Sequence, residues 1–231
     1  MDYLSPARSR RALGAPATLP SGVDHMRRVL VVGLIATVTL VVLQAATQAI
    51  DFGVFNLRFW VFNCDKRYSV FGLASLLAQL AVAASCLWRG RSAEAQRGVW
   101  LGLGALVGML ILIRGLTTFN AKVLAVPLAC VFLVLCWLTL REPGPVRATV
   151  WSGLVLLAAS LLLHKVGLGA DDSTASDFTW AYQITSMIKH GAELAGWMML
   201  ATGIVAGSDE LRRSLAGTLG RLRPGVQSAG S

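Results

Sequence analysis

The chain is poor in charge: only 14% of its 231 residues are Asp, Glu, Lys or Arg, whereas 55% are hydrophobic. A typical soluble domain carries about 25% charged residues, so this composition excludes an ordinary soluble globular protein. The polar stretches lie mainly at the two ends of the sequence and are too short to bury a core of their own. We therefore expect no separate soluble catalytic domain.

Motifs of the common enzyme classes are missing as well. The sequence has no Gly-x-Ser-x-Gly elbow, no His-Glu-x-x-His pair, no glycine-rich phosphate loop and no Cys-x-x-Cys. Its four cysteines match no metal or redox spacing, and three of them lie in apolar stretches. We expect the cysteines to act as small apolar residues, and we predict neither a cofactor nor a metal.

What the sequence does have is a series of apolar blocks of about 20 residues, the length that an α-helix needs to cross a bilayer. The blocks are approximately Val29–Ile50, Tyr68–Trp88, Gly98–Thr118, Lys122–Leu140, Ala148–Val166 and Tyr182–Ala206. They lack the alternating pattern of an outer-membrane barrel. The sequence therefore predicts an all-α integral membrane bundle of six transmembrane helices.

The formal charge of +9 indicates orientation and not nucleic-acid binding, because cytoplasmic segments of membrane proteins carry an excess of Lys and Arg. With six spans, the side that holds both termini carries 14 of these cations and the other side carries 5. We expect both termini in the cytoplasm and a multi-pass protein in the plasma membrane of a bacterium. We expect a transmembrane domain at residues 29–206 between two basic cytoplasmic tails, 1–28 and 207–231. The first of these tails is predicted to be disordered.

Small residues four positions apart recur in the third block. Gly98 and Gly102 form one such pair, and Gly104 and Gly108 form another. Because small side chains let helix backbones approach closely in lipid, we interpret these glycines as helix-packing positions.

Several polar residues, which are unfavourable in the hydrocarbon core of a bilayer, lie at or just below the predicted outer face. The end of the first span carries Gln44, Thr47, Gln48 and Asp51 at spacings that place the four on one helical stripe. The candidate binding residues are Gln44, Gln48, Asp51, Arg114, His164 and Glu193. Together they predict an outer-facing polar pocket.

Glu193 is the deepest acid in this set. If the apolar core of its span begins near Met187, Glu193 lies about six residues further along, or roughly 9 Å at 1.5 Å per residue, which is too deep for its short side chain to reach the interface. An ionisable group inside a span costs on the order of 3 kcal/mol, so it should face the bundle interior with a partner. Arg114 is the natural partner. Their pairing is either a structural ion pair or part of a functional site.

His190 and Glu193 lie three residues apart on one face of the last span, a spacing that suits an acid–base pair or part of a metal site. A hydrolytic zinc site generally needs three protein ligands. Of the histidines, only His164 and His190 lie near the outer face, so an acid from the loop around Asp172 would have to complete the set. Such a site remains an alternative.

The segment after the first span contains Asn56-Leu57-Arg58-Phe59-Trp60 and Asn63-x-Asp65-Lys66-Arg67-Tyr68-Ser69, and the last span contains Glu193-x2-Gly196. These stretches resemble a group of uncharacterised bacterial multi-span membrane proteins. In that group an aspartate-containing outer segment leads into the second helix, and the last helix carries an acid before a glycine. Members also have acids at the outer end of the third helix, where this chain has Arg114. The resemblance implies a multi-span fold and no particular activity.

These observations favour a non-catalytic membrane protein that binds a lipid, a small molecule or a membrane-protein partner through its outer pocket. The main alternative is a membrane enzyme that acts on a lipid-linked substrate, with His190 and Glu193 as acid–base or ligand groups. A transporter is a third class, disfavoured because the six blocks show no clear inverted repeat and no broken helix pair.

Overall fold

The computed structural model describes residues 22–56, 59, 61–62, 69–93, 95–116, 121–167 and 179–221. In these ranges the protein is entirely helical, which confirms the all-α prediction. The helices are α1 (Gly22–Phe55), α2 (Val70–Ser92), α3 (Arg97–Leu116), α4 (Ala121–Thr139), α5 (Gly144–Gly167) and α6 (Trp180–Arg221).

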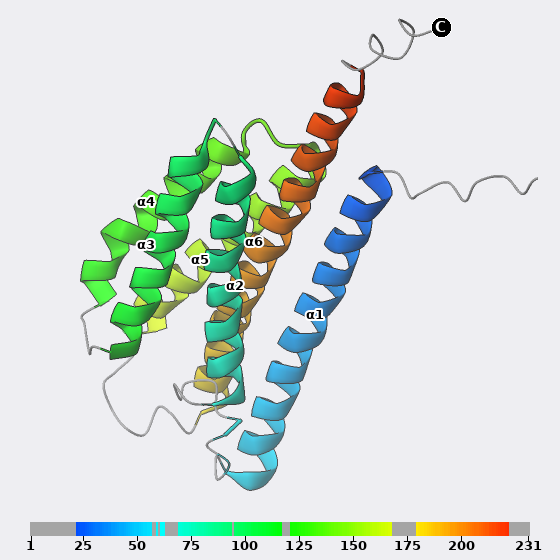
Figure 1. Ribbon diagram of the computed structural model, residues 1–231. Coiled ribbons are helices and arrows are strands. Elements are labelled where there is room, and N and C mark those ends of the chain that lie inside the picture. The colour runs from blue at the N-terminus through cyan, green and yellow to red at the C-terminus, as the bar shows by residue number, and fades with distance from the viewer. Residues whose placement is uncertain are drawn as a thin grey trace, which may run out of the picture.

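Consecutive helices alternate in direction, so the start of α1 and the end of α6 lie at the same end of the bundle (Figure 1). Helix α6 occupies the centre, because it packs against α5, α1 and α2. Helix α3 packs mainly on α2, and α4 lies at the edge with lighter contacts to α3 and α5. A polar group on α6 is therefore within reach of three other helices.

Three helices are long and apolar enough to cross a membrane: Met26–Phe55, Val70–Arg91 and Gly144–Leu163. Two shorter apolar helices are Arg97–Ile113 and Val126–Thr139. In α6 the apolar sequence is interrupted by Lys189, His190 and Glu193. The count of six spans stays a prediction.

The bundle exposes many large apolar side chains. Val32, Leu77, Leu133 and Val155 are each 65% exposed or more. Soluble monomers rarely expose large contiguous apolar patches, so this surface suits contact with hydrocarbon. It is consistent with helices that lie in a membrane.

Of the four glycines expected to pack against a neighbouring helix, only Gly104 does so. A Cβ on Gly104 would lie 3.0 Å from the carbonyl oxygen of Ala83 on α2, but Gly98, Gly102 and Gly108 face open space. A tight contact occurs instead between α5 and α6, where a Cβ on Gly196 would lie 2.9 Å from the carbonyl oxygen of Gly153. Spacing alone had not identified this pair.

Helical structure also extends into both segments expected as tails. Helix α1 begins at Gly22, upstream of the expected start at Val29, and α6 continues to Arg221. Met26 is buried there and packs with Val146 and Ala206 in a small second core. This contact gives the first turns of α1 an apolar anchor.

Candidate functional site

Three polar side chains of α1 are buried against the rest of the bundle. Gln44, Gln48 and Asp51 are each at most 1% exposed. The Nε2 atom of Gln48 donates a hydrogen bond of 2.6 Å to Oε1 of Gln183 on α6. Asp51 Oδ1 accepts a bond of 3.1 Å from the backbone N–H of Phe59. The predicted stripe is therefore buried at these three residues, whereas its fourth member, Thr47, is only partly buried and donates to its own helix backbone.

Glu193 connects α6 with α2. Its Oε1 atom accepts hydrogen bonds from Ser75 Oγ at 3.4 Å and from Gln79 Nε2 at 3.5 Å. Its Oε2 atom lies 3.6 Å from Nδ1 of His190 one turn earlier. The His190 and Glu193 side chains are 23% and 16% exposed, so this part of the site is accessible from the surface.

These residues form two polar groups along α6, one toward α1 and one toward α2, which together we call the α1–α2–α6 polar cluster. It consists of Gln44, Gln48, Asp51, Ser75, Gln79, Gln183, His190 and Glu193. At 100° per residue, His190 lies on α6 between the face that meets α1 and the face that meets α2. Both α1 and α2 pack on α6 with little direct contact to each other. His190 therefore lies on the surface of α6 between α1 and α2.

Gln44 lies in the middle of this region without hydrogen bonds. The antiparallel register pairs Gln48 with Gln183 and Val41 with Gly191, so Gln44 is level with the residues between them on α6. Within the described part of the chain, neither its Nε2 nor its Oε1 atom has a hydrogen-bond partner, although the side chain is 1% exposed. An unsatisfied buried polar group costs about 1–3 kcal/mol. Such atoms mark a place where water or a ligand group binds.

Two further buried atoms, one in the cluster and one next to it, have no hydrogen-bond partner among the residues that the structure describes. One is Oδ2 of Asp51, and the other is Nε1 of Trp197, one turn beyond Glu193. The first is an acceptor and the second a donor. The region therefore offers unused hydrogen-bonding capacity of both kinds.

Two sequence-predicted site residues have no described side chain. Arg114 lies on α3 and His164 on α5, but both side chains are outside the part of the chain that the structure describes. The Arg114–Glu193 ion pair therefore stays a prediction. The described partners of Glu193 come from α2 and α6 instead.

Ser75, Gln79 and Gln183 were missed by the sequence reasoning. Gln79 is 5% exposed in the middle of an otherwise apolar helix, and Gln183 is 1% exposed. A glutamine inside an apolar block is itself a signal, because an amide in hydrocarbon needs a partner.

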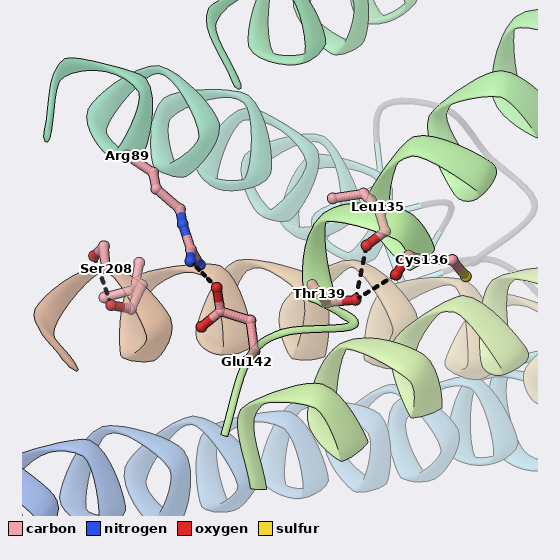
Figure 2. A network of polar contacts seen from close by, with 7 residues as sticks. Arg89, Leu135, Cys136, Thr139, Glu142 and Ser208 are labelled. Carbon is pink, nitrogen blue, oxygen red and sulfur yellow. Dashed lines mark hydrogen bonds and ion pairs between the residues drawn. The ribbon is translucent and has the colours of Figure 1, made fainter. Parts of the chain in front are cut away.

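A different polar site lies at the other end of the bundle (Figure 2). Arg89 on α2 is 3% exposed and forms an ion pair with Glu142, which lies between α4 and α5. Its guanidinium carbon is 4.4 Å from the ring centroid of Trp100 on α3. A Cβ on Gly207 would lie 2.5 Å from Arg89 Nη1, so α6 closes over the pair. Sequence analysis had counted Arg89 among the loop cations that set orientation.

Among the residues that the structure describes, no group of three or more His, Cys, Asp or Glu side chains is placed to hold a metal ion. Cys86, Cys130 and Cys136 are free thiols. Cys86 is fully buried in the apolar core.

The comparisons with known proteins identify no relative, since no family, curated protein or solved structure matches this chain.

Proposed function

We propose that this chain is a six-span plasma-membrane protein that binds a small polar ligand at the α1–α2–α6 polar cluster, without catalysing a reaction. Three helices of spanning length and hydropathy support the membrane placement. The start of α1 and the end of α6 lie at the same end of the bundle (Figure 1). This arrangement agrees with the charge count, in which 14 cations on one side and 5 on the other favour a cytoplasmic side for both termini.

The observation that carries the proposal is the unpartnered amide of Gln44. A buried amide inside a membrane helix is stable only if another group satisfies it, because hydrocarbon offers no hydrogen bonds. A ligand that donates to Oε1 and accepts from Nε2 would meet both needs. Hydroxyl and amide groups have this dual capacity.

Glu193 narrows the ligand chemistry further. Its side chain is an acceptor that binds Ser75 Oγ and Gln79 Nε2 of α2, and a carboxylate in a binding site favours a ligand that donates hydrogen bonds. The ligand is therefore rich in hydroxyl or amino groups and is neutral or positively charged. A soluble polyol or amine and the polar headgroup of a lipid share this chemistry.

A second candidate function rests on the contact between His190 and Glu193. The 3.6 Å separation of Nδ1 and Oε2 resembles a carboxylate that orients an imidazole for proton transfer. In that case the same site would act on the polar part of a lipid-linked substrate, and the imidazole would exchange the proton.

The binding proposal is tested by purifying the full chain in mild detergent and identifying co-purified compounds by mass spectrometry. We expect one hydroxyl- or amino-rich compound that Glu193→Gln depletes. The matched control is Thr47→Ala, because the Thr47 hydroxyl bonds only its own helix backbone, at Leu43 and Gln44. Equal ligand content in wild type and Glu193→Gln would contradict the proposal.

The orientation is tested separately with a reporter that is active only in the cytoplasm. We expect activity when it is fused after Arg223 or in the loop at Arg91, and no activity in the loop at Asp172. Activity at Asp172 would overturn the proposed topology, but would leave the ligand test above unaffected.

A further inference from the structure

A second candidate site lies along the first half of α1, away from the polar cluster. A cavity of about 190 Å³ lies between this half of α1 and helices α5 and α6. Its lining residues are Arg27, Leu30, Val31, Gly33, Leu34, Thr149, Met199 and Thr202. Apolar cavities of about 150 Å³ in proteins stay dry and accept hydrocarbon guests. The size and lining of this cavity therefore favour a hydrocarbon occupant.

The cavity opens toward the surroundings of the bundle. Its wall includes Val31 and Leu34, which are 47% and 52% exposed. The lining on α1 extends from Arg27 to Leu34, about 10 Å along the helix at 1.5 Å per residue. A flexible chain can enter such a space sideways from the lipid.

The cavity has one charged residue in its lining, at one end. Arg27 is exposed and follows Met26, where the apolar span of α1 begins. A cation at the end of a span lies at the depth of the lipid phosphates, where each one adds about 1 kcal/mol of attraction to anionic lipid. The site therefore has a cation at one end, where a phospholipid has its phosphate, and an apolar cavity beside it, where the lipid has its acyl chains.

We propose that this cavity binds one acyl chain of an anionic phospholipid whose phosphate contacts Arg27. The charge pattern distinguishes this occupant from others. A polar solute would leave the apolar side chains of Leu30, Val31, Leu34 and Met199 against polar groups, and a peptide segment would need more hydrogen bonds than the hydroxyls of Thr149 and Thr202 can provide. The site is separate from the α1–α2–α6 polar cluster and does not depend on the ligand proposed there.

The test uses the full chain in nanodiscs that contain equal amounts of phosphatidylglycerol and phosphatidylcholine with the same acyl chains. After extraction into mild detergent, native mass spectrometry counts the retained phospholipid. We expect about one phosphatidylglycerol per protein. Arg27→Gln should lower its retention relative to phosphatidylcholine about fivefold, the ratio that corresponds to roughly 1 kcal/mol per interfacial cation. The matched control Arg28→Gln removes a neighbouring exposed cation that does not line the cavity and should leave the ratio unchanged.

Substitutions that fill the cavity with a phenylalanine side chain provide an independent test of acyl-chain binding. Thr149→Phe should abolish retention of both lipids, whereas Val155→Phe, at a 67% exposed position of the same helix outside the lining, should not. If Thr149→Phe does not fold, Val31→Phe fills the same space from a 47% exposed position. Equal retention of the two lipids in wild type, equal losses in Arg27→Gln and Arg28→Gln, or full retention in the filled variant would each overturn the proposal. Retention of detergent or free fatty acid alone would do the same.

Discussion

The two buried polar sites of the bundle differ in how well their groups are satisfied. Arg89 has a full opposite charge in Glu142 and an aromatic face in Trp100. The side-chain amide of Gln44 has no hydrogen-bond partner among the described residues. A charge with a charged partner holds helices together, whereas a buried amide without a partner is available to another group. We infer that the Arg89 site is structural and that the polar cluster is where binding occurs.

The Nε and Nη1 atoms of Arg89 also have no hydrogen-bond partner among the described residues. The two sites therefore differ in the charged partner and the enclosure of Arg89. The Trp100 ring offsets part of the loss at Arg89, because a desolvated cation over an aromatic face gains about 2 kcal/mol. Compact packing at Gly207 closes the space around the guanidinium. The orphan atoms of Arg89 are thus enclosed, whereas the polar cluster reaches the surface at His190.

The largest effect on stability is expected when the ion pair between Arg89 and Glu142 is broken. Arg89→Leu leaves Glu142 without its partner, and we expect a loss of about 3–5 kcal/mol in unfolding free energy. The double variant Arg89→Leu, Glu142→Leu should be much milder, because no charge is left uncompensated. Reversible unfolding in mixed micelles measures both, and ligand content should stay at the wild-type level in whatever folds. Additive losses would show that the pair is not coupled.

A smaller effect is expected at Glu193. Glu193→Leu removes the acceptor for Ser75 and Gln79, and hydrogen bonds to a charged group contribute about 1.5–3 kcal/mol. A double-mutant cycle with Gln79→Leu should show coupling of about 1 kcal/mol, since the two side chains touch. The same cycle with Arg114→Leu tests the sequence-predicted ion pair, which recovery of folded yield in the double variant would confirm. Independent losses in the Gln79 cycle would contradict the contact described here.

The smallest expected change is at His190. His190→Gln keeps a hydrogen-bond donor of similar size, so we expect stability within about 0.5 kcal/mol of wild type and unchanged ligand content. The outcome separates the two candidate functions. A well-folded His190→Gln protein that retains its ligand but loses a growth phenotype would favour proton transfer, because glutamine cannot exchange a proton near pH 7.

Much of this arrangement follows from the sequence. Apolar blocks locate the helices, although α1 and α6 extend past the expected ends. Helical spacing placed Gln44, Gln48 and Asp51 on one stripe, and these three residues are buried. Periodicity describes one helix at a time, so it shows which residues share a face.

Periodicity does not show which helices are neighbours, and the missed features follow from that. Ser75 and Gln79 became partners of Glu193 only because α2 packs on α6. Arg89 has the same sequence signature as a cytoplasmic loop cation, and only the fold brings Glu142 and Trp100 to it. The glycines of α3 show the same limit, since spacing predicts a small-residue surface without naming what covers it.

The most direct test of the account is Gln44→Leu, measured for stability and for ligand content in the same preparation. Removing a buried amide without partners relieves a cost of about 1–3 kcal/mol, so the ligand-free variant should unfold at a higher temperature than ligand-free wild type. The same variant should have lost the co-purified ligand. A variant that is destabilised and still retains the wild-type amount of ligand would contradict the claim that the α1–α2–α6 polar cluster is a binding site.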